Sequence, residues 1–354
     1  MKKRKCYLRM YLNKNLGDDL FAKLISERYN NIEFIKVSYN SAKSNWENIK
    51  VINGILFKGT NKILKILTKN KITIEKVLAK RLKNTLVIGG SLFIEGKSGG
   101  YEELAKADKY CIIGSNFGPY YTQDYLEKNK RIFKNADYVC FRDTKSYNLF
   151  KEEKDNINVA PDIIFSLDTR NITITNNRKA IISIIDCTSK MGKEYENGYD
   201  EKIIELTEYL IQKKYEITYM SFCKNEGDEL AIERIINKLD NETAKKVSKY
   251  YYDDNIEEAL NILGDSQLIV GSRFHANILG LILNKSIIPI IYSDKTTNVL
   301  QDINYNGKII DIRKINEFKV YDITDDDLEY KIDISKQVED SQIHFVGPDR
   351  ILKK

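Results

Sequence analysis

The sequence of 354 residues is poor in the residues that build metal centres and disulfide frameworks. Its five cysteines, an odd number, lie far apart and never form a C-x-x-C pair. This spacing excludes a disulfide framework and a cysteine zinc site, and it favours buried thiols in a reducing cytoplasm. Histidine is scarcer still, with two in the whole chain. The sequence therefore predicts no metal site.

Long apolar runs are missing as well. No stretch approaches the roughly 20 apolar residues that a membrane-spanning helix needs. The basic start, Met1–Lys5, is similar to the first part of a signal peptide, but the segment after it is short and contains Arg9. We therefore expect a cytoplasmic protein without a transmembrane segment.

The charge balance is mildly basic. Lys and Arg number 57 against 51 Asp and Glu, and the resulting net charge of +6 is not concentrated in an arm. Nucleic acid is therefore not an expected partner. A mild positive charge still attracts anionic substrates, or anionic lipids at the inner face of the membrane, so peripheral membrane contact stays open.

Apolar strand-like runs alternate with helix-like segments along the whole chain. Strands are expected at 6–12, 32–37, 85–88, 109–113, 138–141, 157–159, 180–185, 216–221, 268–270 and 287–291. Helices are expected between them, at 18–28, 122–135, 144–151, 201–213, 228–238 and 256–263. This alternation is typical of parallel α/β units.

A polar stretch without periodicity, 166–179, separates two such series. We therefore expect two Rossmann-like domains facing each other across a cleft, at 1–168 and 178–314. The tail, 315–354, is expected either to pack back on the first domain or to stay loose. The lysine-rich segment 41–80 is weakly patterned, and we interpret it as an insertion on the cleft side.

One segment of the second half combines a cation with a histidine. The run from Gly271 to Ala276 reads G-S-R-F-H-A and follows a short apolar strand. Ligands of open α/β sheets bind at the carboxyl ends of the strands, where Arg273 would hold an anion and His275 would move a proton. Lys295 follows the next strand and is expected at the same edge. A structural hydrogen bond is the alternative role for the histidine.

Three glycine-containing turns follow strands of the first half. They contain Asn15, Gly17 and Asp18; Gly89, Gly90 and Ser91; and Gly114, Asn116 and Pro119. Such turns expose backbone N–H groups and allow a ligand to approach closely. An ordinary turn or loop is the alternative explanation for each of them, so both interpretations stay open.

Arg142 and Asp143 stand between a strand and a helix. Asp143 is explained as the helix cap. A cation at a helix N-terminus opposes the helix dipole, so Arg142 indicates either an anionic ligand or a surface ion pair.

Taken in chain order, these segments resemble the polysaccharide pyruvyl transferase family. The shared elements are N-x-G-D at 15–18, the glycine turn at 89–91, G-x-x-x-G-P at 114–119, R-D-x-x-S at 142–146, A-P-D at 160–162, G-S-R-x-H-A at 271–276 and Y-x-x-K at 292–295. The resemblance runs from residue 13 to about residue 300, although the family often has more glycines at 89–91. It implies a GT-B-like pair of Rossmann domains. It also implies transfer of a pyruvyl group from phosphoenolpyruvate to a sugar, as a ketal, in bacterial surface polysaccharide biosynthesis.

The resemblance also assigns roles to residues. His275 becomes the catalytic residue, and Arg142, Arg273, Lys295 and Ser272 become ligands of phosphoenolpyruvate. The candidates for the acceptor side are Asn15, Gly17, Asp18, Gly89, Gly90, Ser91 and Asn116. Tyrosines such as Tyr120, Tyr121 and Tyr292 are candidates to stack on a sugar ring, with packing as the alternative.

The residue types agree with this chemistry. Phosphoenolpyruvate carries a phosphate and a carboxylate, and arginine forks match both groups. Ketal formation begins with a proton delivered to the methylene carbon, which a histidine can supply near neutral pH. The reaction needs phosphoenolpyruvate as co-substrate and no further cofactor or metal.

Two other functions stay open: a nucleotide-sugar-dependent GT-B glycosyltransferase, and an inactive binding protein of a glycan pathway. The acceptor sugar, its linkage, whether it is free or lipid-linked, and the oligomeric state are not predicted.

Overall fold

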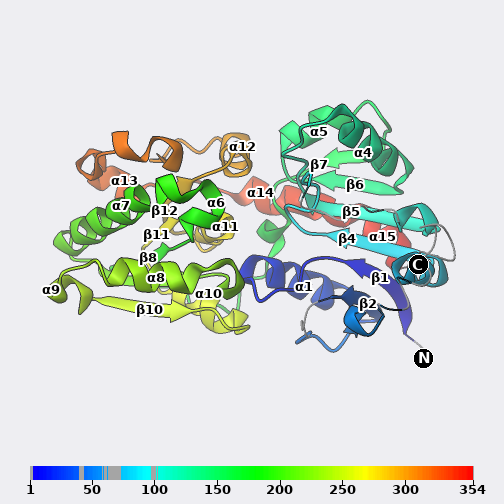
Figure 1. The fold of residues 1–354 in the computed structure, drawn as a ribbon, viewed down its shortest axis with the longest axis horizontal. Helices are drawn as coiled ribbons and strands as arrows, with labels where there is room; N and C mark the ends of the chain where they lie inside the picture. Colours follow the sequence, from blue (N-terminus) through cyan, green and yellow to red (C-terminus); the bar gives the residue numbers. More distant parts are fainter. Residues whose placement is uncertain are drawn as a thin grey trace. The chain divides into compact units, whose positions relative to one another are not determined.

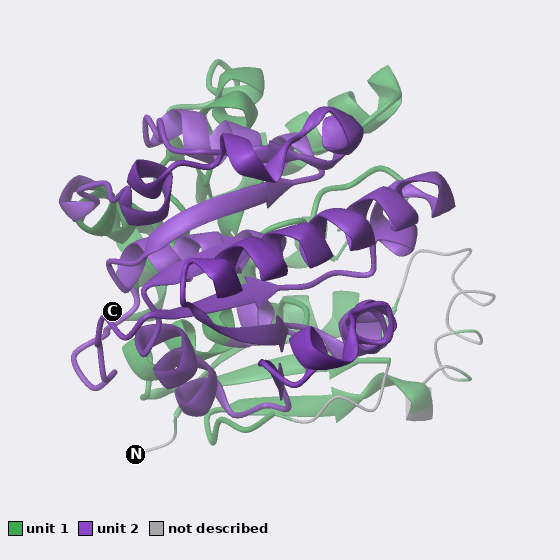
Figure 2. Ribbon diagram, turned by 90° about the vertical axis from the view of Figure 1, so that its left-hand side faces the viewer, with its two compact units in different colours: residues 1–12, 20–166, 337–354 green, residues 13–19, 167–336 purple. Residues whose placement is uncertain are grey.

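The computed structural model describes residues 3–39, 44–57, 59, 62, 73–96, 101 and 103–353. The chain forms two compact units, which Figure 2 shows in different colours. Unit 1 contains residues 1–12, 20–166 and 337–354, and unit 2 contains residues 13–19 and 167–336. Each unit is built around its own parallel sheet, so the predicted α/β fold with two Rossmann-like sheets is confirmed.

Unit 1 has a seven-stranded sheet in the order β3-β2-β1-β4-β5-β6-β7. Its strands are β1 (Arg4–Arg9), β2 (Ile32–Ser38), β3 (Ile49–Asn53), β4 (Asn84–Ile88), β5 (Lys109–Ser115), β6 (Tyr138–Phe141) and β7 (Ile157–Val159). Helices α1 (Leu16–Arg28), α3 (Ile74–Leu82), α4 (Gln123–Asn135) and α5 (Thr144–Phe150) connect them (Figure 1). All pairings are parallel, which requires a crossover connection between neighbouring strands.

Unit 2 has a six-stranded sheet in the order β10-β9-β8-β11-β12-β13. Its strands are β8 (Lys179–Ser183), β9 (Glu216–Ser221), β10 (Val247–Tyr251), β11 (Leu268–Gly271), β12 (Ser286–Ile291) and β13 (Ile310–Asp311). Its helices are α6 (Cys187–Met191), α7 (Lys193–Gln212), α8 (Asp228–Ile236), α9 (Asn241–Ala244), α10 (Ile256–Gly264), α11 (Phe274–Ile282), α12 (Asp294–Asp302) and α13 (Asp325–Glu329). Helix α14 (Ser335–Asp340) begins in unit 2 and continues into the part of the chain that belongs to unit 1. These strands also pair only in parallel, so their carboxyl ends lie at one edge.

The central strands are buried on both faces, which explains why they read as apolar runs. All residues of β6, β11 and β12 are buried. Strands β3, β10 and β13 escaped the sequence analysis. In β10 no residue is fully buried, because it is an edge strand, so its sequence carries no apolar run.

The limits of the two units differ from the boundaries expected from the sequence. Residues 13–19 group with unit 2, and the C-terminal tail divides at residue 336. Residues 337–354 pack on unit 1 through the turn η7 (Ser341–Phe345) and helix α15 (Val346–Leu352). Within the segment 41–80, described residues form β3, the turn η1 (Gly54–Phe57) and the start of α3, and the rest lies outside the described residues.

Candidate functional site

The carboxyl edge of the unit 2 sheet gathers charged residues from four neighbouring strands. Strand β9 leads to Glu226 and Asp228, β8 to Lys190, β11 to Arg273 and His275, and β12 to Tyr292 and Lys295. We call these seven residues the charged edge. Three of the predicted site residues, Arg273, His275 and Lys295, therefore come from two adjacent strands, as the sequence predicted.

Arg273 is held by a buried carboxylate. It stands at the N-cap position of α11 and is 7% exposed. Its Nε donates to Asp228 Oδ2 at 2.9 Å, and its NH2 group donates to the other oxygen of the same carboxylate. The backbone N–H groups of Phe222 and Cys223 also donate to Asp228 Oδ2, at 3.0 and 2.9 Å. The guanidinium plane is thus fixed by the turn after β9.

Glu226 joins Arg273 to Lys190. Its Oε2 accepts from the NH1 group of Arg273 and, at 2.5 Å, from Nζ of Lys190. Burial alone would raise the pKa of Glu226, but the charges of Arg273 and Lys190 outweigh it and hold this pKa at about 2. Glu226 is therefore ionised at neutral pH. Its side chain is 36% exposed, whereas that of Asp228 is fully buried.

Tyr292 and Lys295 complete the edge. Nζ of Lys295 lies 5.6 Å from the ring centroid of Tyr292 and 5.9 Å from that of Phe274. Burial raises the pKa of the Tyr292 phenol, but the charges of Lys295, Arg273 and Lys190 reverse this shift and leave the pKa lowered. The edge is therefore electropositive at this point, which favours an anion.

His275 is the second residue of α11 and lies against a backbone from the other end of the chain. A β-carbon at Gly17 would overlap Nδ1 and Cγ of the His275 ring, so only glycine fits there. The turn at Gly17 is tied to unit 2, because the Leu16 N–H donates to the Phe222 carbonyl at 3.0 Å. Asn15 stabilises the turn by accepting the Gly17 N–H at 3.0 Å. The sequence placed these residues on the acceptor side, whereas the structure places Gly17 beside the candidate acid.

Ser272 has a position inside the sheet edge. Its hydroxyl lies 2.9 Å from the Tyr199 hydroxyl, which also accepts the Ile185 N–H at 3.2 Å, and Ser272 is 2% exposed. Ser272 thus links the end of β11 to helix α7 and the turn after β8. This network holds the start of α11, and with it the backbone at Arg273 and His275.

In unit 1, four of the predicted motifs meet at one buried arginine. Arg142 donates to Asp162 Oδ2 at 3.0 Å and to Asn116 Oδ1 at 2.6 Å, and it is 3% exposed. A β-carbon at Gly90 would overlap the guanidinium group, so the second glycine of that turn is required by close packing. Asp143 caps α5 by accepting the Ser146 N–H at 2.8 Å, as predicted.

The remaining candidates of the glycine turns have supporting positions. Gly89 has a φ of +146°, and its carbonyl accepts the Ser115 hydroxyl at 2.7 Å. Ser91 follows this turn and is half-buried, and Asp18 lies half-buried in the first turn of α1. Arg142 and Asn116 belong to unit 1, whereas Arg273, His275 and Lys295 belong to unit 2.

Sequence reasoning missed Lys190, Glu226 and Asp228. Each follows a strand of the same sheet, and this placement was the available signal. It also missed a buried acid in the first turn of α1: Asp19 accepts a hydrogen bond from the Tyr252 hydroxyl at 2.8 Å. Burial raises the pKa of Asp19 to about 6, although the Tyr252 hydrogen bond opposes this shift.

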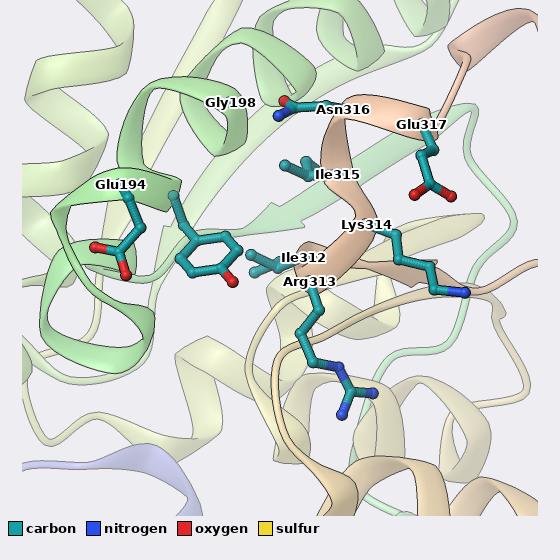
Figure 3. A pocket seen from close by; sticks show the side chains of 9 residues that line it. Glu194, Gly198, Ile312, Arg313, Lys314, Ile315, Asn316 and Glu317 are labelled. Atoms are coloured by element: carbon teal, nitrogen blue, oxygen red, sulfur yellow. The ribbon is translucent and has the colours of Figure 1, made fainter.

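A pocket of about 180 Å³ opens elsewhere in unit 2, between the start of α7 and the turn η5 (Ile312–Glu317). Figure 3 shows the side chains of Glu194, Arg313 and Lys314 around it. Arg313 at this pocket is bound to Asp311 and Asp294.

The described part of the chain contains neither a cluster of metal ligands nor a membrane-spanning helix. No group of three His, Cys, Asp or Glu side chains there is arranged to hold a metal ion. No helix among the described residues is both long and apolar enough to span a membrane.

Solved structures of low sequence identity share the fold. A glycosyltransferase from Rickettsia africae matches with a TM-score of 0.53 and 14% identity, covering 100% of this chain and 97% of its own. HepE from Anabaena, in complex with UDP and glucose, matches with a TM-score of 0.52 and 9% identity, covering 99% and 95%. The UDP-GlcNAc 2-epimerase from Methanocaldococcus jannaschii matches with a TM-score of 0.53 and 13% identity, covering 92% of both chains. These similarities show a GT-B-like fold and nothing about the substrate.

The sequence profile of one family covers the N-x-G-D turn and every residue of the charged edge except Lys295. The polysaccharide pyruvyl transferase profile matches residues 15–294, which is most of the chain. The matched range begins at Asn15 and ends beside Lys295, so it includes the turn against His275 and the loops that carry Lys190, Glu226 and Arg273. The chain belongs to the polysaccharide pyruvyl transferase family.

Proposed function

We propose that this protein transfers the enolpyruvyl-derived group of phosphoenolpyruvate to two hydroxyls of a sugar, forming a pyruvate ketal and releasing phosphate. The observation that carries the proposal is the charged edge within a chain of this family. The charges of Lys295, Arg273 and Lys190 all act on Tyr292, and His275 stands in the first turn of the helix that begins after Arg273. Such an edge suits a small substrate with two anionic groups.

The proposed chemistry assigns a role to each group. His275 donates a proton to the methylene carbon of phosphoenolpyruvate, which leaves an oxocarbenium-like centre at the adjacent carbon. One sugar hydroxyl attacks this carbon and loses its proton. The bond between this carbon and the bridging oxygen breaks, and phosphate leaves with that oxygen. A second hydroxyl then attacks, loses its proton and closes the ketal.

The cations act on the phosphate and the carboxylate. Arg273 and Lys295 hold these groups and stabilise the negative charge on the leaving phosphate. Ser272 keeps the start of α11 in position through its bond to Tyr199. Arg142 is proposed as a further donor ligand from unit 1, with Asn116 and the turn of Gly89, Gly90 and Ser91 on the acceptor side.

The family resemblance makes Asn15, Gly17 and Asp18 candidates for the acceptor side of the site. We propose that Gly17 instead sets the position of the His275 ring, because its backbone packs against that ring. Asn15 supports the turn. Asp18, in the first turn of α1, stays a candidate for acceptor contact.

The deciding experiment incubates the purified protein with phosphoenolpyruvate and a panel of free, nucleotide-linked and lipid-linked sugars. Phosphate release is followed together with mass spectrometry of the sugar. We expect phosphate release that depends on one acceptor class, with a product that carries a pyruvate ketal. A parallel arm replaces phosphoenolpyruvate with UDP-sugars. Glycosyl transfer in that arm, without ketal formation in the first, would establish a glycosyltransferase instead.

A further inference from the structure

We propose that the anionic donor binds Lys190 and Arg273 by displacing the carboxylate of Glu226, so that Lys190 is a further donor ligand and Glu226 sets the donor affinity. This inference rests on the proposed function, because it takes phosphoenolpyruvate as the donor. It adds two residues that neither the sequence motifs nor the family resemblance singled out.

Arg273 forms hydrogen bonds with two different carboxylates. Its Nε and NH2 groups bind Asp228, and its NH1 group binds Glu226. Asp228 is fully buried and also accepts two backbone N–H groups, so it belongs to the framework of the turn. Removing the Glu226 carboxylate would free the NH1 group at the edge of the guanidinium while the Asp228 bonds keep its orientation.

Glu226 and Asp228 lie in different elements and differ in burial. Glu226 ends a single 3-10 turn, η4 (Lys224–Glu226), none of whose residues is buried. Gly227 follows with a φ of +86°, a conformation that separates this turn from helix α8. Asp228 is the first residue of α8. Glu226 can therefore turn away without disturbing Asp228.

The charge of the Glu226 carboxylate is shared between two cations. Glu226 Oε2 bridges Arg273 and Lys190, which is the arrangement that one oxygen of a phosphate or carboxylate would also adopt. With Asp228 neutralising Arg273, the Glu226 carboxylate is the counter-ion of Lys190. An incoming anion that takes its place meets Lys190 and the NH1 group of Arg273, the two donors that Glu226 now occupies. The exchange keeps an anion on Lys190 and Arg273, and the displaced Glu226 carboxylate, whose side chain is already 36% exposed, turns to water.

The test measures binding alone, by calorimetry, with phosphoenolpyruvate and with inorganic phosphate as separate probes. Glu226→Gln removes the competing charge and keeps the shape, so both probes should bind about tenfold more tightly than to the wild type. Lys190→Ala removes a proposed ligand, so both should bind about tenfold more weakly. Lys190 is partly exposed, and its replacement is expected to leave folding intact.

Two neighbouring residues supply matched controls. Glu229→Gln removes an acidic charge from the same segment, and Lys193→Ala removes a basic charge just after α6; their partners are Lys224 and Glu196. Both variants should bind the probes as the wild type does. If Glu226→Gln binds no more tightly than the wild type, or Glu229→Gln tightens binding equally, the displacement is overturned.

The two probes separate this inference from the proposed function. If phosphate binding tightens in Glu226→Gln but phosphoenolpyruvate does not bind either protein, the exchange at Glu226 is supported and the donor assignment fails. If phosphoenolpyruvate binds the wild type and Lys190→Ala equally well, the donor assignment stands and the role of Lys190 is overturned.

Discussion

The backbone of Gly17 lies against the imidazole ring of His275. The two residues are far apart in the sequence, because Gly17 precedes β2 and His275 follows β11. A side chain at position 17 would occupy the space of Nδ1 and Cγ of that ring. The N-terminal motif therefore sets the position of the candidate acid, through packing rather than through a polar side chain.

Gly17→Ala should lower kcat strongly while phosphoenolpyruvate still binds. The added methyl group pushes the His275 ring from its place, and a misplaced catalytic group of this kind costs about 10²-fold in rate. The comparison is Gly59→Ala, because a β-carbon at Gly59 meets nothing within 4 Å. Equal turnover in the two variants would show that the contact at Gly17 does not position His275.

His275→Ala should abolish transfer and leave both folding and donor binding largely intact, because the ring acts on a proton and makes no contribution to the Arg273 and Lys295 charges. The measurement is phosphate release in a coupled assay, with calorimetric binding of phosphoenolpyruvate on the same protein. Near-normal turnover in His275→Ala would exclude the acid role.

Arg273→Ala should weaken both stability and donor binding. The change leaves the buried Asp228 carboxylate without its guanidinium partner, and breaking a buried pair of this kind costs about 3–5 kcal/mol. The double variant Arg273→Met with Asp228→Asn removes both charges and keeps an oxygen that can accept the Phe222 and Cys223 N–H groups, so it should recover part of the stability in urea unfolding, but none of the affinity for phosphoenolpyruvate. Donor affinity unchanged in Arg273→Ala would remove this residue from the donor site.

Because the second histidine, His344, is buried and has a lowered pKa, we expect the folded protein to lose stability in mild acid. It is fully buried in unit 1, where Nδ1 accepts the Gly114 N–H at 3.3 Å and Nε2 lies 2.8 Å from the Pro161 carbonyl oxygen. Burial lowers its pKa from 6.5 to about 4. The unfolded chain therefore binds a proton at a higher pH than the folded chain does. Stability should be complete above pH 6.5 and fall as the pH drops towards 4.

The lowering of the His344 pKa from 6.5 to about 4 corresponds to a loss of about 3 kcal/mol in the free energy of unfolding between these two pH values. Denaturant unfolding of the wild type at several pH values measures it, with His344→Gln as the comparison because glutamine does not titrate. A His344→Gln protein with the same loss between pH 6.5 and 4 would show that another group is responsible.

Local sequence patterns were sufficient to predict most strands and helices of the fold. Strands such as β11 and β12 are buried along their whole length, so they appear as apolar runs in the sequence, and the cap at Asp143 follows from its place before α5. The order of the strands did not follow, because pairing such as that of β8 with β11 joins distant segments. Strand β10 lies at the edge of its sheet and is only partly buried, so its sequence is weakly apolar. The search for apolar runs therefore did not detect it.

Strand, turn and helix are encoded by short-range composition, so the sequence already indicates that Arg273, His275 and Lys295 follow two successive buried strands. The contacts of these residues follow from the folded chain alone. Asp228 and Glu226 reach Arg273 from the turn after β9, and Gly17 reaches His275 from the other end of the chain. Such contacts depend on the order and register of strands that pair across long separations, and no local pattern specifies which side chain a sheet edge will bring into reach.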